Sequence, residues 1–168
     1  MVAVDFSVYS VKLVKYARGI AEDLKANLVF VNVINKRDIH AIRQAFGYHS
    51  KSLSVDDYIS KLKHERAEKM QKLIEKTSCT NITHRVIIRT GIPFMELINA
   101  AEEAHVDIVI MGAKGRSDLA GILFGSTAEK MFRYCPVPLL SIRLKYQQTG
   151  GAPIFRPLYL FYSNYLKN

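Results

Sequence analysis

Short apolar runs alternate along this chain with stretches whose apolar residues recur every three or four positions. Residues 28–34 (LVFVNVI) form a near-continuous apolar run, which is typical of a parallel strand that is covered on both faces. Residues 8–25 instead place their apolar side chains on one face of a helix, at Val11, Val14, Ala17 and Leu24 among others. The repeated order of strand and helix predicts an α/β fold: an open, five-stranded parallel sheet with helices on both faces.

The same patterns predict where each element lies. A first helix is expected between an N-cap at Ser7 and a stop at Asn27, and a second is expected to be capped by Asp56 and Asp57. Residues 35–54 are polar and irregular, and we expect them to form a long loop. The expected strands are residues 2–4, 28–34, 86–88, 107–111 and 138–142, and the two remaining helices open at residues 91–93 and at Ser126.

A glycine-rich segment follows the expected fourth strand. Residues 112–115 (GAKG) come directly after the apolar run 108–111, and Gly125, Ser126 and Thr127 come directly before a helical pattern. Glycine lets the backbone approach a phosphate closely, and the helix that follows directs unpaired N–H groups at the same place. The order of strand, glycine loop and helix therefore predicts an anion site.

The alternative interpretation of this segment is purely structural. Ser126 followed by Glu129 has the spacing of a capping box, in which the two side chains satisfy the first N–H groups of a helix. A tight turn with a helix cap would explain the same residues without a ligand.

Asp5 directly follows the first expected strand, just as Gly112 follows the fourth. Ligands of open parallel sheets bind beyond the carboxyl ends of the strands, near the point where the strand order reverses. If these two strands are neighbours, Asp5 and the glycine loop frame one crevice. The alternative for Asp5 is that it only caps the first helix.

Composition narrows the class of protein. The chain of 168 residues carries a formal net charge of +9, but no basic run is interleaved with aromatic residues. This favours a solvated basic surface or attraction of an anionic small ligand over nucleic acid binding. No apolar run reaches the ~18 residues of a membrane span. With two isolated cysteines, Cys79 and Cys135, and no secretory signal pattern, the expected compartment is the cytoplasm.

The glycine pattern and its surroundings resemble the universal stress protein family, specifically its ATP-binding branch. That branch carries glycine, two residues, glycine, nine residues, glycine and Ser or Thr, which Gly112, Gly115, Gly125 and Ser126 match without a gap. The other stretches similar to the family are residues 2–7 (VAVDFS), 91–93 (GIP), 106–112 (VDIVIMG) and 135–138 (CPVP). The resemblance implies a Rossmann-like fold of the adenine nucleotide alpha hydrolase type over residues 1–143.

The resemblance also implies roles for single residues. Asp5 would lie near the adenine and ribose, with Val33 and Met111 near the base, while Gly112 and Gly115 would let the chain wrap the ribose and phosphates. The segment 125–127 would hold the phosphates of ATP, or of AMP or ADP, with a bridging Mg²⁺ or Mn²⁺. The full set of expected nucleotide contacts is Asp5, Phe6, Ser7, Val33, Met111, Gly112, Gly115, Arg116, Gly125, Ser126 and Thr127.

Three functional hypotheses follow from these observations. The first is an ATP-binding sensor or regulatory protein, a homodimer that pairs through the exposed edge of the fifth strand. The second is a slow ATPase or autophosphorylating protein, although no catalytic residue is indicated. The third is a nucleotide-free dimeric interaction module, in which the apolar and aromatic tail, residues 144–168, docks on its own domain or on a second copy.

Overall fold

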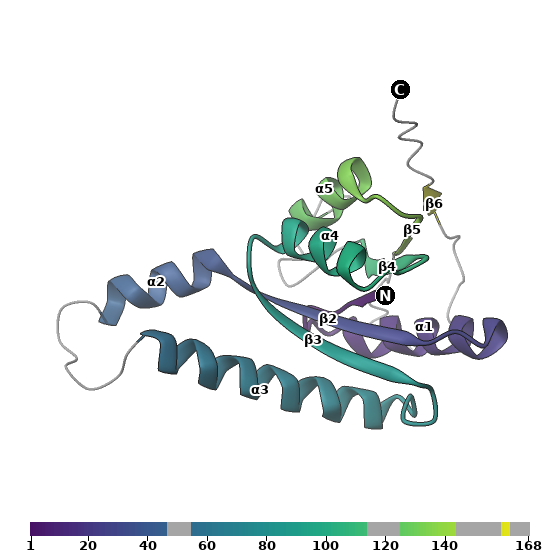
Figure 1. Ribbon diagram of the computed structural model, residues 1–168, viewed down its shortest axis with the longest axis horizontal. Helices are drawn as coiled ribbons and strands as arrows, with labels where there is room; N and C mark the ends of the chain where they lie inside the picture. The colour runs from purple at the N-terminus through teal and green to yellow at the C-terminus, as the bar shows by residue number, and fades with distance from the viewer. Residues whose placement is uncertain (47–54, 114–124, 144–158, 162–168) are drawn as a thin grey trace, which may run out of the picture.

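The computed structural model describes residues 1–46, 55–113, 125–143 and 159–161 (Figure 1). Six strands form one sheet in the order β3-β2-β1-β4-β5-β6. The strands are β1 (Val2–Ala3), β2 (Leu28–Asn35), β3 (His84–Gly91), β4 (Val109–Gly112), β5 (Leu139–Ile142) and β6 (Tyr159–Phe161). The helices are α1 (Ser10–Leu24), α2 (Lys36–Phe46), α3 (Val55–Lys76), α4 (Pro93–Glu103) and α5 (Ser126–Tyr134). The first five strands are parallel, which confirms the predicted α/β architecture.

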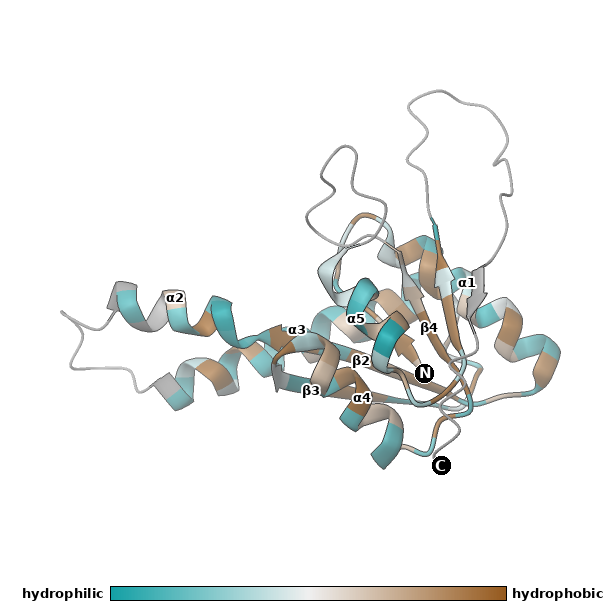
Figure 2. Cartoon of the chain, turned by 90° about the horizontal axis from the view of Figure 1, so that it is seen from above, coloured by the Kyte–Doolittle hydropathy of each residue, from teal (hydrophilic) through white to brown (hydrophobic). Residues whose placement is uncertain are grey.

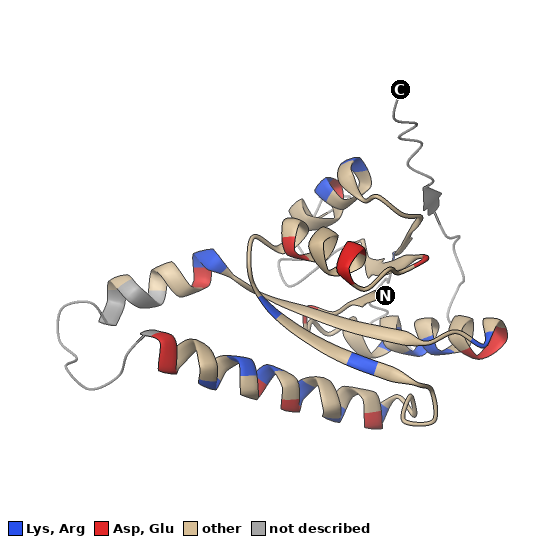
Figure 3. Ribbon diagram, viewed as in Figure 1, with Lys and Arg blue, Asp and Glu red and all other residues tan. Residues whose placement is uncertain are grey.

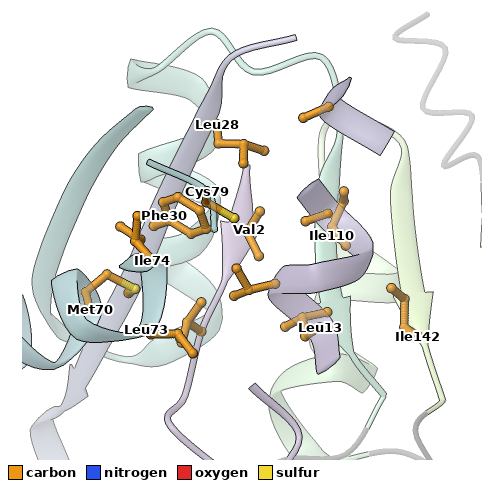
Figure 4. Packing of buried hydrophobic residues seen from close by; sticks show 14 of the residues in the cluster. Val2, Leu13, Leu28, Phe30, Met70, Leu73, Ile74, Cys79, Ile110 and Ile142 are labelled. Carbon is orange, nitrogen blue, oxygen red and sulfur yellow. The ribbon is translucent and has the colours of Figure 1, made fainter. Parts of the chain in front are cut away.

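The sheet lies between two layers of helices. On one face, α1 and α3 bury Leu13, Met70 and Ile74 against Val2 and Phe30 of the sheet (Figure 4). On the other face, α4 and α5 bury a second cluster against the same strands. The central strands β1, β2 and β4 are apolar over most of their length, as the brown of β4 in Figure 2 illustrates. This double burial explains why the strands have continuous rather than alternating apolar sequences.

Helix α1 follows its predicted period over most of its length. Val14 and Ala17 are buried as expected, but Leu24 in the last turn is 70% exposed, so the predicted apolar face is one turn too long. The helix is capped by Tyr9 rather than Ser7, and it ends at Lys25, which has a left-handed φ of 51°. The backbone N–H of Lys25 bonds the carbonyls of the last turn, so the chain leaves the helix before Asn27.

The prediction of a loop over residues 35–54 is wrong for its first part, where α2 continues directly from β2. Residues 36–46 contain no proline or glycine, and Asp38 lies in the first turn, where its charge favours a helix N-terminus. The polarity of the segment hid this helix, because Ile39 is the one buried side chain among its described residues. In both views, α2 and the beginning of α3 extend beyond the end of the sheet (Figures 1 and 2).

The edge of the sheet beyond β5 is occupied by the chain itself. Strand β6 pairs antiparallel with β5, with Leu140 opposite Leu160. The sequence left the conformation of this tail open and treated β5 as an exposed edge, and the second of these expectations is wrong. Within the described residues, no helix is long and apolar enough to cross a bilayer.

Candidate functional site

A cavity of about 510 Å³ opens at the carboxyl ends of β1, β2 and β4. These three strands lie side by side, because β1 pairs with β2 on one side and with β4 on the other. The first and fourth strands are thus neighbours, which meets the condition under which Asp5 and the glycine loop frame one crevice. The volume lies within the range of about 300–1,000 Å³ that is typical of small-molecule sites.

Asp5 lines this cavity from the loop between β1 and α1. One oxygen of its carboxylate, Oδ1, accepts hydrogen bonds from the backbone N–H of Ser7 at 2.9 Å and from the Ser10 hydroxyl at 3.2 Å. Asp5 therefore shapes the loop that leads into α1, but the prediction that it caps the helix is wrong, because the N-cap position belongs to Tyr9 and no side chain makes a capping hydrogen bond there. Asp5 also lines the cavity, and its contact with a ligand stays a prediction.

The described ends of the glycine segment line the same cavity as Asp5. The Ala113 N–H donates to the carbonyl of Ile142 at 3.0 Å, and the Gly125 N–H donates to the carbonyl of Ala113 at 2.9 Å. The second bond joins the two ends of the glycine loop at the mouth of the cavity. Residues Gly112, Gly125, Ser126 and Thr127 all line the cavity at this place.

Helix α5 begins at Ser126 with Gly125 as its N-cap, and no side chain makes a capping hydrogen bond there. The predicted capping box of Ser126 and Glu129 is therefore wrong, because Ser126 already lies inside the helix. Glu129 instead accepts a hydrogen bond from Arg133 at 3.0 Å. The first N–H groups of α5 lack a side-chain partner among the described residues, and they lie where the cavity begins.

Asn32 on β2 supports the floor of the cavity and is 3% exposed. Its side-chain amide donates to the backbone carbonyl of Val4 at 2.7 Å. A backbone hydrogen bond lies beside it, in which the Val4 N–H donates to the carbonyl of Val31 at 2.8 Å. Together these bonds hold the chain just before Asp5 against the middle of β2.

Both charges are present at the rim of the cavity. Arg66 of α3 lines it with its guanidinium 5.5 Å from the ring centroid of Phe6. From α2, Arg37 and Asp38 line the same cavity. Phe6 has a left-handed φ of 59° and packs against the core between the sheet and α1, so it does not line the cavity itself.

The structure brings most of the predicted contacts together. Those that line the cavity are Asp5, Ser7, Val33, Met111, Gly112, Gly125, Ser126 and Thr127. Phe6 is not among the described residues that line the cavity, although Arg66, which lines it, lies over the Phe6 ring. Gly115 and Arg116 lie outside the described residues.

Sequence reasoning missed Asn32, Arg66 and Leu97, which also line the cavity. Arg66 lies in the middle of a long helix that is distant in sequence, so only the tertiary fold brings it to the site. Arg37 also lines the cavity, and it lies in the polar segment 35–54, whose basic residues Lys36, Arg37, Arg43 and Lys51 outnumber the single acid Asp38.

Within the described part of the chain, no group of three or more His, Cys, Asp or Glu residues has the arrangement of a metal site. The hydroxyls of Ser126 and Thr127 and the carboxylates of Asp5 and Asp38 are oxygen donors of the kind that Mg²⁺ accepts beside phosphates.

Comparison with known proteins finds relatives and solved structures that are similar to this chain. Universal stress protein MJ0577 of Methanocaldococcus jannaschii is 28% identical over 149 residues, which cover 84% of this chain and 91% of the relative. A solved structure of MJ0577 has a TM-score of 0.71 at 26% identity and covers 86% of this chain and 94% of its own.

Universal stress protein YxiE of Bacillus subtilis is 24% identical over 143 residues, which are 85% of this chain and 97% of YxiE. The structure of the universal stress protein from Archaeoglobus fulgidus in complex with dAMP shares the fold, with a TM-score of 0.54 at 15% identity, over 84% of this chain and 94% of its own. The model of the Universal stress protein family matches residues 1–143. The chain therefore belongs to the universal stress protein family.

Proposed function

We propose that this protein binds ATP in the cavity at the carboxyl ends of β1, β2 and β4 and acts as a nucleotide-dependent sensor or regulator. The observation that carries the proposal is the placement of Asp5 and the beginning of α5 around one cavity. An acidic side chain that can accept hydrogen bonds from hydroxyls faces a helix N-terminus that attracts anions. A nucleotide carries the matching groups, because its ribose has hydroxyls that donate to a carboxylate and its phosphates are anions.

The phosphates would lie against Gly125, Ser126 and Thr127. The first N–H groups of α5 and two hydroxyls converge there, and no side chain caps the helix in competition with a ligand. A Mg²⁺ or Mn²⁺ ion bound to the phosphates would complete its coordination with water and with these hydroxyls. The metal would lower the charge repulsion between the phosphates.

The nucleoside would occupy the other half of the cavity. Val33 and Met111 supply apolar walls from β2 and β4, and Asp5 lies between them at the end of β1. The dAMP complex of the Archaeoglobus fulgidus protein supports an adenine nucleotide, because that protein has the same fold. AMP and ADP fit the same half of the cavity as ATP.

A regulatory role requires binding without rapid turnover. Of the carboxylates that line the cavity, Asp5 already accepts hydrogen bonds from Ser7 and Ser10 through one oxygen, so that oxygen is engaged in the loop.

Slow hydrolysis of ATP is the second hypothesis from the sequence, and release of phosphate is the measurement that detects it. A homodimer stays a prediction from the sequence, and pairing through β5 would first require displacement of β6.

Titration calorimetry with ATP and Mg²⁺ tests the proposal directly. We expect saturable binding of one nucleotide per chain, and no binding at millimolar ATP would refute it. The double variant Ser126→Ala, Thr127→Ala should weaken ATP by about tenfold, equivalent to about 1.4 kcal/mol, and leave adenosine unchanged. The control is Ser60→Ala, an exposed serine of α3 that lines neither side of the cavity.

Mass spectrometry of small molecules released from the denatured protein gives an independent answer. An adenine nucleotide should accompany the purified chain and be lost in the double variant. Release of labelled phosphate, measured on the same samples, separates a binding protein from a slow hydrolase.

A further inference from the structure

A second cavity of about 630 Å³ adjoins the first at its phosphate end. Both cavities are lined by Arg37, Pro93, Ser126 and Thr127, together with Asn35 at the end of β2. A phosphate chain that starts at the beginning of α5 therefore reaches the second cavity without leaving the protein surface. The second cavity extends from there between α2 and α5.

The second cavity is strongly cationic. The basic side chains that line it are Lys36, Arg37 and His40 from α2 and Lys130 from α5. Among the described residues that line it, none is acidic. Figure 3 shows the basic residues at the beginning of α2 and along α5.

The acidic neighbours do not neutralise this cavity. Glu129, beside Lys130, bonds to Arg133 on the exposed side of α5. Asp38 lines the first cavity but not the second. None of Lys36, Arg37 and Lys130 forms an ion pair within the described residues, so the charge of these three side chains is available to a ligand.

The second cavity also has an apolar side. Ile92, which is 46% exposed, lies there beside Pro93 and Phe94. The Lys130 ammonium nitrogen is 4.7 Å from the centroid of the Phe94 ring. A flat aromatic group could rest on this apolar surface while an attached phosphate contacts Lys130. A phosphate group without an attached aromatic ring would make no contact with this apolar surface.

The volumes of the two cavities distinguish ATP from a ligand with two nucleosides. The second cavity is as large as a complete small-molecule site, and the first already suits one nucleotide. A terminal phosphate of ATP would fill only the border between them. Two cavities of this size, joined through a cationic border, match two nucleosides joined by a phosphate chain.

We propose that the two cavities form one continuous site for a dinucleoside polyphosphate. The first nucleoside occupies the first cavity, the phosphate chain crosses Ser126, Thr127 and Arg37, and the second nucleoside lies against Ile92 and Phe94. This inference rests on the proposed function, because it places the first nucleoside in the same cavity.

The test compares three ligands on the whole chain by calorimetry: AMP, adenosine tetraphosphate and diadenosine tetraphosphate. The last two carry four phosphates each and differ by the second nucleoside. We expect diadenosine tetraphosphate to bind at least about tenfold more tightly than adenosine tetraphosphate, because its second nucleoside adds contacts within one molecule. Equal affinities would overturn the proposal.

The double variant Lys36→Gln, Lys130→Gln changes only side chains of the second cavity. It should weaken diadenosine tetraphosphate by about tenfold or more and leave AMP within about twofold. The control Lys15→Gln, Lys72→Gln removes the same charge from exposed positions that line neither cavity. An equal loss in both double variants would show a general charge effect and overturn the proposal.

The same data separate this inference from the proposed function. If AMP and ATP bind but the second nucleoside adds nothing, only the dinucleoside site is wrong. If none of the nucleotides binds, both proposals are wrong.

Discussion

The side-chain amide of Asn32 donates a hydrogen bond of 2.7 Å to the backbone carbonyl of Val4. This bond joins the middle of β2 to the chain that leaves β1, directly before Asp5. A side chain thus continues the pairing of β1 and β2 past the point where the regular strand β1 ends at Ala3. The position of Asp5 at the cavity depends on this link.

Asn32→Asp should lower the free energy of unfolding by about 1–3 kcal/mol at neutral pH. The substitution keeps the shape of the side chain but removes the N–H donor, and it leaves a buried carbonyl without its partner. Urea denaturation measures the change. The matched control is Asn27→Asp, an exposed asparagine, which should change stability by less than about 0.5 kcal/mol. Equal stability of the two variants would contradict the supporting role of Asn32.

Asp5→Asn should weaken adenosine, AMP and ATP alike, by about tenfold each. The asparagine oxygen can still accept from Ser7 and Ser10, so the loop keeps its bonds, whereas hydrogen bonds from ribose hydroxyls to a neutral acceptor are weaker than those to a carboxylate. Calorimetry measures the three affinities, and Asp23→Asn, on the exposed side of α1, is the control. A tighter affinity for ATP in Asp5→Asn would place the carboxylate near the phosphates and contradict the assignment to the ribose.

Removal of residues 144–168 should make the protein associate with itself. Without β6, the N–H and C=O groups along the outer edge of β5 lose their antiparallel partner, and such an edge can pair with a second copy. Light scattering over a range of concentrations gives the mass of the whole and truncated chains. An unchanged mass would mean that β6 does not protect this edge from association.

Both cysteines should react slowly with iodoacetamide in the folded protein. Cys79 and Cys135 are buried, and burial raises the pKa of the Cys135 thiol, so at neutral pH less of it is present as the reactive thiolate. Mass spectrometry should find both cysteines unmodified in buffer and both alkylated in concentrated urea. Fast modification of Cys135 without denaturant would contradict its burial between the sheet and α5.

The sequence predicted the layers of the fold because burial on both faces leaves a clear pattern. The strands around Phe30 and Ile110 are continuous apolar runs, and α5 begins at Ser126 as expected. The sequence also placed Gly112 directly after the fourth strand, and Gly112 and Gly125 line the same cavity as Asp5. These features are local in sequence, so periodicity and turn chemistry are enough to find them.

The features that the sequence did not predict have a common physical cause, because each of them depends on tertiary contacts. Polar residues hid α2, whose stability depends on its junction with β2 and on the burial of Ile39. The side chain of Arg66 comes to the cavity only because α3 packs under the sheet. The pairing of β6 with β5 joins segments that no sequence period relates.

Helix α2 is less firmly packed than the other elements that line the site. Its first turn supplies Arg37 and Asp38 to the first cavity, yet Ile39, at 5% exposure, is the one described side chain of the helix that is buried. The rest of the site is built on strands and helices that share the core. Opening of this one wall therefore requires far less free energy than unfolding of the sheet, and amide hydrogens of α2 should exchange with solvent while those of β1, β2 and β4 remain protected.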